Sequence, residues 1–505
     1  MILVELTAAV DSIGTLQTFY VSTDSFVTAP TDTPGNIAFE TRLIDPGTLG
    51  VNVFSDGRTG GSTKLETGEI VLANSDGGLD AWLNYSFDGR AVTIRSGDGG
   101  AYPAAFHTLL VATIESAEAS LDKFILRLKD KQQVFILPAL TARYAGNNSL
   151  PNGLEGTSTD LKGKVKPRTF GKVFNVPPPL VNTAKLTYEV GPCQSISSVY
   201  DRGLALTPGA DFATSTLLQA ASPAASTYVT CFAEGYFRLG STPAGQITAD
   251  VAQGTAAANR TVGQIVKQLA LNAGLTAGEI SSADVAALDV VAPQTVGIWL
   301  SDESSFAQEM DRVVASVGAY YGFDGAGVLR LGRITEPSGT PAVTLYESDT
   351  LRGFERRPPR DNGIPLWRVV LSHTKIWTTQ PSDLAGAVSA ATRAYLAEPV
   401  RKANAEDATI KTQWLLAGTV EEETLLTVTA DAETEAARRL NLYKVRRDIF
   451  DTPVSIDLLT ANSLKLGDVV ALQVSRFGLT SGKSFRIIGI RLALATGTAL
   501  ITLWG

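Results

Sequence analysis

The alternation of apolar and polar residues is clearest in the last fifty residues. Residues 468–474 and 484–490 are rich in β-branched and aliphatic side chains, and short polar and glycine-containing segments bound both. With 453–458 and 500–505, they predict a meander of four strands, whose turns fall at Gly467-Asp468, 480–482 and 495–498. We therefore expect Trp504 to lie inside a sheet.

The N-terminal region, 1–140, shows a similar pattern. Short apolar runs are separated by Asp-Gly and Gly-Gly turns, at a spacing typical of antiparallel sandwiches and barrels. A first strand is expected at 1–6, and a closing hairpin is expected to pair 124–128 with 134–137. Further strands are predicted at 19–21, 50–54, 69–72, 91–95 and 112–115.

The middle of the chain divides into two further units. Residues 141–255 are loop-rich, with strands expected at 185–190, 199–200 and 228–232, and we interpret them as a β-rich insertion. Residues 256–340 predict an α+β helix-hairpin domain. Its first helix would follow a capping box at Thr261 and Gln264, its second would begin near Ser304, and a hairpin at 319–331 would end it.

Residues 341–505 return to a β pattern. Strands are predicted at 341–345 and 366–371, and a helix from Asp431 to Tyr443. Between them, 382–409 is expected to be an alanine-rich, loosely helical segment that forms an extended or protruding loop. The predicted fold is mainly β with an α+β insertion. Its four domains are 1–140, 141–255, 256–340 and 341–505.

Composition narrows the class of protein. With 505 residues, 19% of them charged, the chain is long enough for several folded domains. The net charge of −8 argues against a surface that grips nucleic acid throughout. We expect no signal peptide, no stable membrane insertion and synthesis in the host cytoplasm. Cys193 and Cys231 are too few for a disulfide framework or a four-thiolate metal site, and we expect them to be small buried residues.

The sequence contains no convincing catalytic or metal-binding site. His107 and His373 lack partners at catalytic or metal-ligand spacing, and we expect core or surface roles for them. The acids 421–423 are interpreted as a solvated face, because consecutive strand residues point apart. The basic cluster 356–360 could contact phosphates, but a subunit contact or solvated loop is favoured, and the glycines at 97–100 form a turn. We predict no catalytic, cofactor-binding or metal-binding residues, no cofactor and no enzyme activity.

Two groups of residues resemble a known family. The segments 171–181 and 199–203 resemble a signature of tail proteins from long-tailed (siphovirus-like) phages and tail-like particles. The C-terminal segments resemble the closing barrel of the baseplate or tail-tip hub proteins in that group. These segments are 466–470, 476–479, 485–490 and 500–505.

The resemblance implies two domains of the tail-tube β-barrel fold, at 1–140 and 341–505, in a homotrimeric hub of the virion. Such a hub continues the tail tube, contacts the distal tail protein ring and the tape measure protein, and carries a central fibre or receptor-binding protein. Phage DNA would pass through its lumen without specific binding, and an acidic lumen would suit that passage.

Two other functions remain open at this stage. One is a virion-associated hydrolase of peptidoglycan or glycan, since acids are plentiful. The other is an adhesin for host glycans that uses the loops around Ala220 and Leu384.

Overall fold

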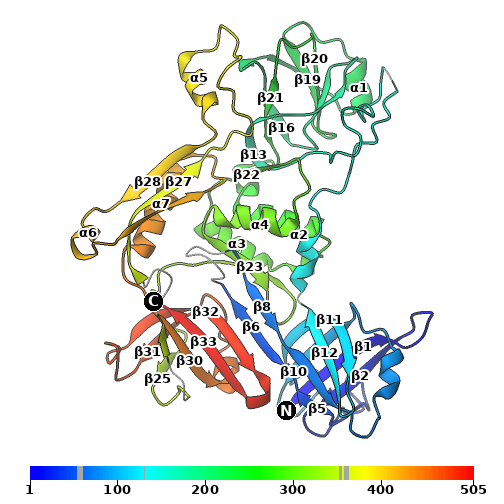
Figure 1. Ribbon diagram of the computed structural model, residues 1–505, viewed down its shortest axis with the longest axis vertical. Coiled ribbons are helices and arrows are strands. Elements are labelled where there is room, and N and C mark those ends of the chain that lie inside the picture. Colours follow the sequence, from blue (N-terminus) through cyan, green and yellow to red (C-terminus); the bar gives the residue numbers. More distant parts are fainter. Residues whose placement is uncertain (54–60, 130, 150, 352–354, 358–362) are drawn as a thin grey trace.

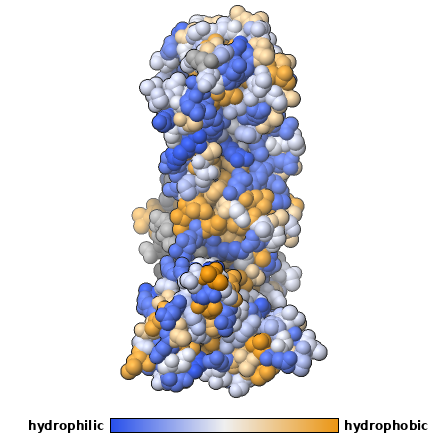
Figure 2. Space-filling model, turned by 90° about the vertical axis from the view of Figure 1, so that its right-hand side faces the viewer, coloured by the Kyte–Doolittle hydropathy of each residue, from blue (hydrophilic) through white to orange (hydrophobic). Residues whose placement is uncertain are grey.

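The computed structural model describes residues 1–53, 61–129, 131–149, 151–351, 355–357 and 363–505. The molecule is elongated, with two large sheets at its lower end and a smaller β-rich part at its upper end (Figure 1). The face in Figure 2 is largely hydrophilic, with apolar patches near mid-height and lower down. The described residues are mainly in strands, so the predicted mainly-β fold class is confirmed.

The first large sheet is antiparallel and comes entirely from the N-terminal region. Its strand order is β2-β1-β10-β11-β12-β9-β5. Burial alternates along β12, where Phe124, Leu126 and Leu128 face the core and their neighbours face outward. The strands are β1 (Ile2–Ala9), β2 (Leu16–Ser22), β5 (Leu43–Asp45), β9 (Glu69–Ala73), β10 (Ala91–Ser96), β11 (His107–Ala119) and β12 (Lys123–Lys129); β3 (Phe26–Val27) and β4 (Ala38–Phe39) form a separate small pair.

The second large sheet is built around the C-terminal strands, in the order β25-β31-β32-β33-β30-β26. Strand β32 also pairs with β6, from Gly489 opposite Asn52 to Ala493 opposite Thr48. An N-terminal strand therefore belongs to the C-terminal sheet. The strands are β6 (Thr48–Asn52), β8 (Lys64–Thr67), β25 (Thr344–Tyr346), β26 (Glu355–Arg357), β30 (Ile449–Ser455), β31 (Val469–Gln473), β32 (Lys483–Ala493) and β33 (Thr498–Trp504).

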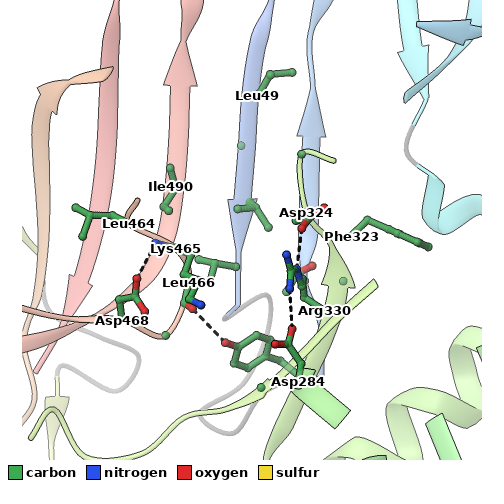
Figure 3. A pocket seen from close by; sticks show the side chains of 18 of the residues that line it. Leu49, Asp284, Phe323, Asp324, Arg330, Leu464, Lys465, Leu466, Asp468 and Ile490 are labelled. Carbon is green, nitrogen blue, oxygen red and sulfur yellow. Dashed lines mark hydrogen bonds and ion pairs between the residues drawn. The ribbon is translucent and has the colours of Figure 1, made fainter. Parts of the chain in front are cut away.

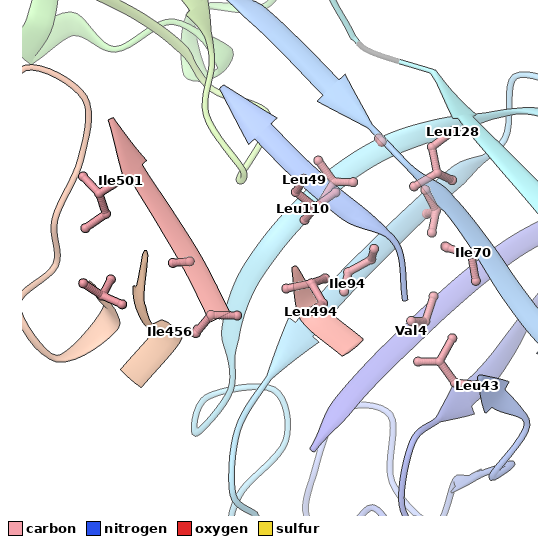
Figure 4. Close-up of a cluster of buried hydrophobic side chains, with 14 of the residues drawn as sticks. Val4, Leu43, Leu49, Ile70, Ile94, Leu110, Leu128, Ile456, Leu494 and Ile501 are labelled. Atoms are coloured by element: carbon pink, nitrogen blue, oxygen red, sulfur yellow. The ribbon is translucent and has the colours of Figure 1, made fainter. Parts of the chain in front are cut away.

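One hydrophobic core serves both large sheets. Val4, Ile70 and Ile94 from the first sheet and Leu494 and Ile501 from the C-terminal part belong to the same buried cluster (Figure 4). Burying apolar surface contributes roughly 25 cal/mol per Å². The two sheets are therefore stabilised together.

A helical layer lies above the two sheets. Helices α2 and α4 pack against one another, and Val266 and Met310 are fully buried in their shared core. The layer comprises α2 (Val262–Asn272), α3 (Ser282–Val291) and α4 (Phe306–Ala315), with a small sheet of β7 (Gly61–Ser62), β23 (Ala319–Phe323) and β24 (Leu329–Arg333).

The upper part contains two five-stranded sheets. The first has the order β17-β16-β21-β13-β22 and the second the order β14-β15-β20-β19-β18. Their elements are β13 (Arg168–Val176), β14 (Leu180–Asn182), β15 (Thr187–Glu189), β16 (Ser195–Asp201), β17 (Leu204–Ala205), β18 (Thr207–Asp211), α1 (Ser215–Ala220), β19 (Thr227–Cys231), β20 (Tyr236–Leu239), β21 (Ile247–Ala252) and β22 (Gly297–Leu300).

A three-stranded sheet, ordered β28-β27-β29, forms the left side of Figure 1, and helix α7 packs on it. It carries a short helix, α6, between β28 and β29. The elements are β27 (Leu366–His373), α5 (Ala390–Ala397), β28 (Arg401–Glu406), α6 (Ile410–Gln413), β29 (Gly418–Glu423) and α7 (Thr429–Tyr443).

Most predicted elements are present, with five corrections. Residues 134–137 do not form a hairpin strand, because Lys131–Ile136 is a 3-10 helix. The predicted strand 453–458 ends at Ser455, whose hydroxyl caps helix α8 (Ile456–Ala461). Strand β30 pairs with β33, so only β31, β32 and β33 form a meander.

The other two corrections concern the segment 382–409 and the capping contact of Gln264. The alanine-rich segment 382–409 contains helix α5, in agreement with its loosely helical pattern, but it also contains β28, which pairs with β27 and was not predicted. The Thr261 hydroxyl caps α2 as expected, but the Gln264 amide donates to Asp289 at 2.7 Å instead of reaching back to Thr261.

The C-terminal Trp504 is 3% exposed and packs edge-on against Tyr443, with the Arg447 guanidinium 5.0 Å from its ring centroid. We expect Trp504→Ala to lower the free energy of unfolding by about 3–5 kcal/mol, because the change leaves a cavity in a packed core. Urea denaturation measures this change in the free energy of unfolding. Leu121→Ala, at a side chain that is 95% exposed, is the control and should change stability by less than about 0.5 kcal/mol. A silent Trp504→Ala would show that the ring does not support the core.

Candidate functional site

The two histidines lie in different places and share no site. His373 is 1% exposed at the end of β27, with Nδ1 2.8 Å from the Thr374 hydroxyl, and burial lowers its pKa. His107 is exposed at the start of β11. Within the described ranges, no three His, Cys, Asp or Glu residues are grouped closely enough to hold a metal ion.

The cysteines fit the role of small apolar residues. Both thiols are free, with Cys231 buried and Cys193 partly buried. Burial raises the pKa of Cys193 to about 12. A neutral thiol is a poor nucleophile, so Cys193 is unsuited to covalent catalysis.

The three acids on β29 point alternately to opposite sides, as expected for a strand. Glu421 is exposed and pairs with Lys402. Glu422 points the other way and pairs with Arg439, which is 1% exposed. The interpretation of 421–423 as a solvated face is therefore wrong for Glu422.

A buried ionic network surrounds Glu435, in the middle of α7. This carboxylate is fully buried and contacts three guanidinium groups: Arg438 at 2.8 Å, Arg439 at 2.6 Å, and Arg333 from β24. With Glu422, the network has three positive and two negative side chains. It joins α7 and β29 to the helix-hairpin layer.

Backbone carbonyls at two helix ends compensate the extra positive charge. Arg439 donates to the carbonyl of Ala315 at 2.6 Å, at the end of α4. Arg333 donates to Val291, the last residue of α3, at 2.6 Å and to Val317 at 2.8 Å. Carbonyls at helix C-termini carry partial negative charge and have no partner within the helix. The network therefore also caps α3 and α4.

The network keeps Glu435 ionised. Burial alone would raise its pKa, but the hydrogen bond from Arg438 and the charges of Arg439 and Arg333 outweigh it and hold the pKa below its usual value. Burial lowers the pKa of Arg333 to about 10, and the neighbouring Arg438 and Arg439 add to that effect against the attraction of Glu435. The ionic network around Glu435 therefore holds α7 and β29 against the helix-hairpin layer.

The basic cluster 356–360 is only partly described. Arg356 and Arg357 lie on β26. Arg356 pairs with Asp448, immediately before β30, and Arg357 donates to Asp451 of β30 at 3.0 Å. Residues 358–360 lie outside the described residues. Both described arginines are thus paired within the chain.

A second buried acid lies in the upper part, on β15. Glu189 is 4% exposed, and its Oε2 has no hydrogen-bond partner among the described residues. Burial raises its pKa to about 7. The nearby Lys166 does not neutralise it fully, since its ammonium group is 2.6 Å from Glu155.

A cavity of about 440 Å³ lies where β6, the β23–β24 hairpin and the turn before β31 meet (Figure 3). Its apolar lining includes Leu49, Leu466 and Ile490. Its charged lining residues are three acids and three bases: Asp284, Asp324, Asp468, Arg330, Arg333 and Lys465.

The charged groups of this cavity are largely engaged with one another. Arg330 Nε lies 2.7 Å from Asp324, and Nη1 lies 3.6 Å from Asp284. Asp468 accepts from the backbone N–H of Lys465 at 2.9 Å. No histidine or cysteine is among the described lining residues. The lining is mainly apolar, and its aspartates make ion pairs or backbone hydrogen bonds.

The segments that carry the family resemblance have structural roles. Residues 199–203 make the turn between β16 and β17, where Arg202 and Gly203 have positive φ. Asp201 accepts from the N–H groups of Ala244 and Gly245, at 2.7 and 3.0 Å. Gly171 has φ +72°, and a Cβ there would lie 2.0 Å from the Val296 carbonyl oxygen.

The two segments named for the adhesin alternative are largely exposed, but the side chain of Leu384 itself is buried. Leu384 is 7% exposed and packs with Val388 and Leu396, so its side chain is not presented to a ligand. Ala220 lies at the end of α1. None of the helices in the described ranges is long and apolar enough to cross a membrane.

Comparison with known proteins gives matches among solved structures only. No family model and no curated protein matches the chain. The tail protein from Neisseria meningitidis MC58 is 10% identical, with a TM-score of 0.43, and covers 92% of this chain and 95% of its own. The prophage MuSo2 43 kDa tail protein from Shewanella oneidensis is 11% identical, with a TM-score of 0.43. The match covers 99% of this chain and 95% of that protein.

A chain from the virion of a native gene transfer agent particle is 15% identical, with a TM-score of 0.44, and covers 68% of this chain and 85% of its own. Two of these three are named tail proteins, the class that the sequence resemblance indicated. Because the TM-scores are below 0.5, these likenesses alone assign no function to this chain.

We expect Glu435→Gln to lower the free energy of unfolding by about 3–5 kcal/mol, because it leaves buried guanidinium groups without their counter-charge. Chemical denaturation with two-state analysis checks this. Glu421→Gln, whose side chain is 55% exposed in its pair with Lys402, is the matched control, expected to change stability by at most about 1 kcal/mol. Equal effects of the two changes would contradict the role assigned to Glu435.

The raised pKa of Glu189 predicts a pH-dependent stability. The folded protein holds a proton on this carboxyl up to about pH 7, whereas the unfolded chain loses it near pH 4.5. The contribution to stability is therefore fully present below about pH 4.5 and is lost as the pH rises to 7. Glu189→Gln should flatten the dependence in that window, as measured by melting temperature. An unchanged slope would show that Glu189 does not titrate there.

Proposed function

We propose that this chain is a structural hub of a phage tail tip or baseplate. Three copies form a ring that continues the tail tube, connects the distal tail protein ring to a central fibre or receptor-binding protein, and forms part of the DNA ejection channel. The chain acts by shape and contact and catalyses no reaction.

One observation carries this proposal: each chain holds two large, mainly antiparallel sheets side by side around a single core. A trimer of such chains offers six sheets, which matches a sixfold tube. The shared core and the pairing of β6 with β32 fix the angle between the two sheets within each copy. A ring assembled from such rigid pairs has a defined diameter.

The chemistry of the described residues supports a structural role. The buried charged side chains around Glu435 form ion pairs with one another and connect two parts of the chain. The cavity beside β6 has no histidine among its described lining residues. The net charge of −8 suits a channel wall that repels phosphate groups.

Electron microscopy of intact particles labelled on this chain tests the proposal. We expect label at the tail tip alone and three copies of the chain per particle. The isolated ring should have the mass of three chains. Purified protein should leave a peptidoglycan zymogram uncleared. Label along the whole tube, or a copy number that is not a multiple of three, would overturn the hub assignment, and clearing of the cell wall would overturn the structural role.

A further inference from the structure

An irregular segment of the chain covers part of the second upper sheet. It comprises 141–149 and 151–166, precedes β13, and has no helix or strand among its described residues. Tyr144 and Leu161 of this segment lie in one buried cluster with side chains of β14, α1, β19 and β20. We call the segment the strap.

Side-chain amides hold the strap against β14. The Asn148 amide donates to the carbonyl of Val181 at 2.6 Å. The Asn182 amide donates to the carbonyls of Pro151 and Gly153, at 2.8 and 2.6 Å. These are separate hydrogen bonds and not a strand ladder, so the strap can open while the sheet beneath it stays paired.

Glu189 lies beneath the strap. It stands opposite Tyr236 in the pairing of β15 with β20 and is 4% exposed. Tyr144 of the strap faces it. Neither the Tyr144 hydroxyl nor Oε2 of Glu189 has a hydrogen-bond partner among the described residues. The closed strap therefore holds a carboxyl in a largely apolar site.

The cations around Glu189 are engaged elsewhere. Lys166 of the strap attracts the carboxyl, but its ammonium group is 2.6 Å from Glu155, whose own charge opposes ionisation of Glu189. Arg238 of β20 donates to the carbonyl of Gln219 at 2.6 Å. The other titratable groups near this site are Tyr144, Tyr236, Cys231 and Glu234. An ionised Glu189 is thus a buried charge with incomplete compensation, which agrees with its raised pKa.

We propose that the strap is a pH-sensitive cover, closed while the carboxyl of Glu189 is protonated and open when that carboxyl loses its proton. Opening lets water reach the charge, which removes the cost of burying it. It also uncovers the apolar side chains of β14, α1 and β19. The cover is built within a single chain, so it does not depend on the proposed ring.

The direction of the pH response follows from the two states. Under the closed strap the carboxyl keeps its proton up to about pH 7, whereas a solvated carboxyl loses it near pH 4.5. The closed state is therefore favoured below about pH 4.5 and loses this advantage as the pH rises to 7. The opening constant should rise at least tenfold between about pH 5 and about pH 8, since each pH unit between the two pKa values contributes up to a factor of ten.

Hydrogen exchange of a single amide measures the opening. The Gly156 N–H donates to the Val181 carbonyl at 3.2 Å, between strap and sheet, so it exchanges when the strap opens. Its opening constant, corrected for the intrinsic exchange rate at each pH, should rise as stated in the unmodified protein. In Glu189→Gln, whose amide mimics the protonated carboxyl, it should not change with pH.

Two controls separate the strap from the rest of the chain. Glu303→Gln removes an acid that pairs with Arg143 of the strap at 2.7 Å but is 63% exposed, and this variant should keep the pH response of the unmodified protein. The Gln253 N–H donates to the Gly171 carbonyl at 2.7 Å, outside the strap. It should exchange only through global unfolding, measured by urea denaturation at the same pH, whereas Gly156 should open more often than that.

A native thiol gives a second measurement. Cys231 is buried in the cluster that Tyr144 and Leu161 cover. At about pH 8, a thiol reagent should label Cys231 at least tenfold faster in the unmodified protein than in Glu189→Gln, because the strap is open more often. Mass spectrometry of the labelled peptides distinguishes Cys231 from Cys193.

Three results would overturn the proposal. The first is an opening constant at Gly156 that does not change with pH, or that changes equally in Glu189→Gln. The second is exchange of Gly156 only through global unfolding. The third is equal labelling of Cys231 in the two proteins. None of these results bears on the position or copy number of the chain in particles, which test the hub separately.

Discussion

Strand β32 is the element on which the lower half of the molecule depends. Its first half pairs with β31, its second half pairs with β6, and β33 runs along its other edge. Because β6 comes from the N-terminal region, the two ends of the chain meet in one sheet and share one core. The angle between the two large sheets is therefore set by backbone hydrogen bonds and by side-chain packing together.

The Glu435 network has the equivalent role at the next level. Its arginines join α7 and β29 to β24 and to the ends of α3 and α4. A buried ion pair contributes little net stability compared with apolar packing, but it is specific in geometry, because each carboxylate oxygen and guanidinium N–H needs a partner. The network thus fixes one orientation of the helical layer relative to the three-stranded sheet.

The sequence predicted local structure better than long-range pairing. The alternation in 484–490 and the helical stripe from Phe306 to Val314 were read correctly, because burial on one face leaves a periodic pattern. The pairing of β6 with β32 has no local signature. Glu422 was predicted to face solvent because its partner, Arg439, lies on the next helix and local sequence gives no sign of the pairing. The cavity joins residues from widely separated segments, so it could not be located from the sequence.

The pairing of Thr48 with Ala493 also constrains how the chain is made. On the ribosome, β6 emerges long before its partner β32, because most of the described chain lies between them. Until then, one edge of β6 and the apolar residues that face the C-terminal strands lack their partners, and such edges are prone to pair with other chains. The first sheet can form during synthesis, but the lower half closes only after β32 and β33 have emerged. A stop of translation before β32 would therefore leave β6 and the apolar residues beside it exposed.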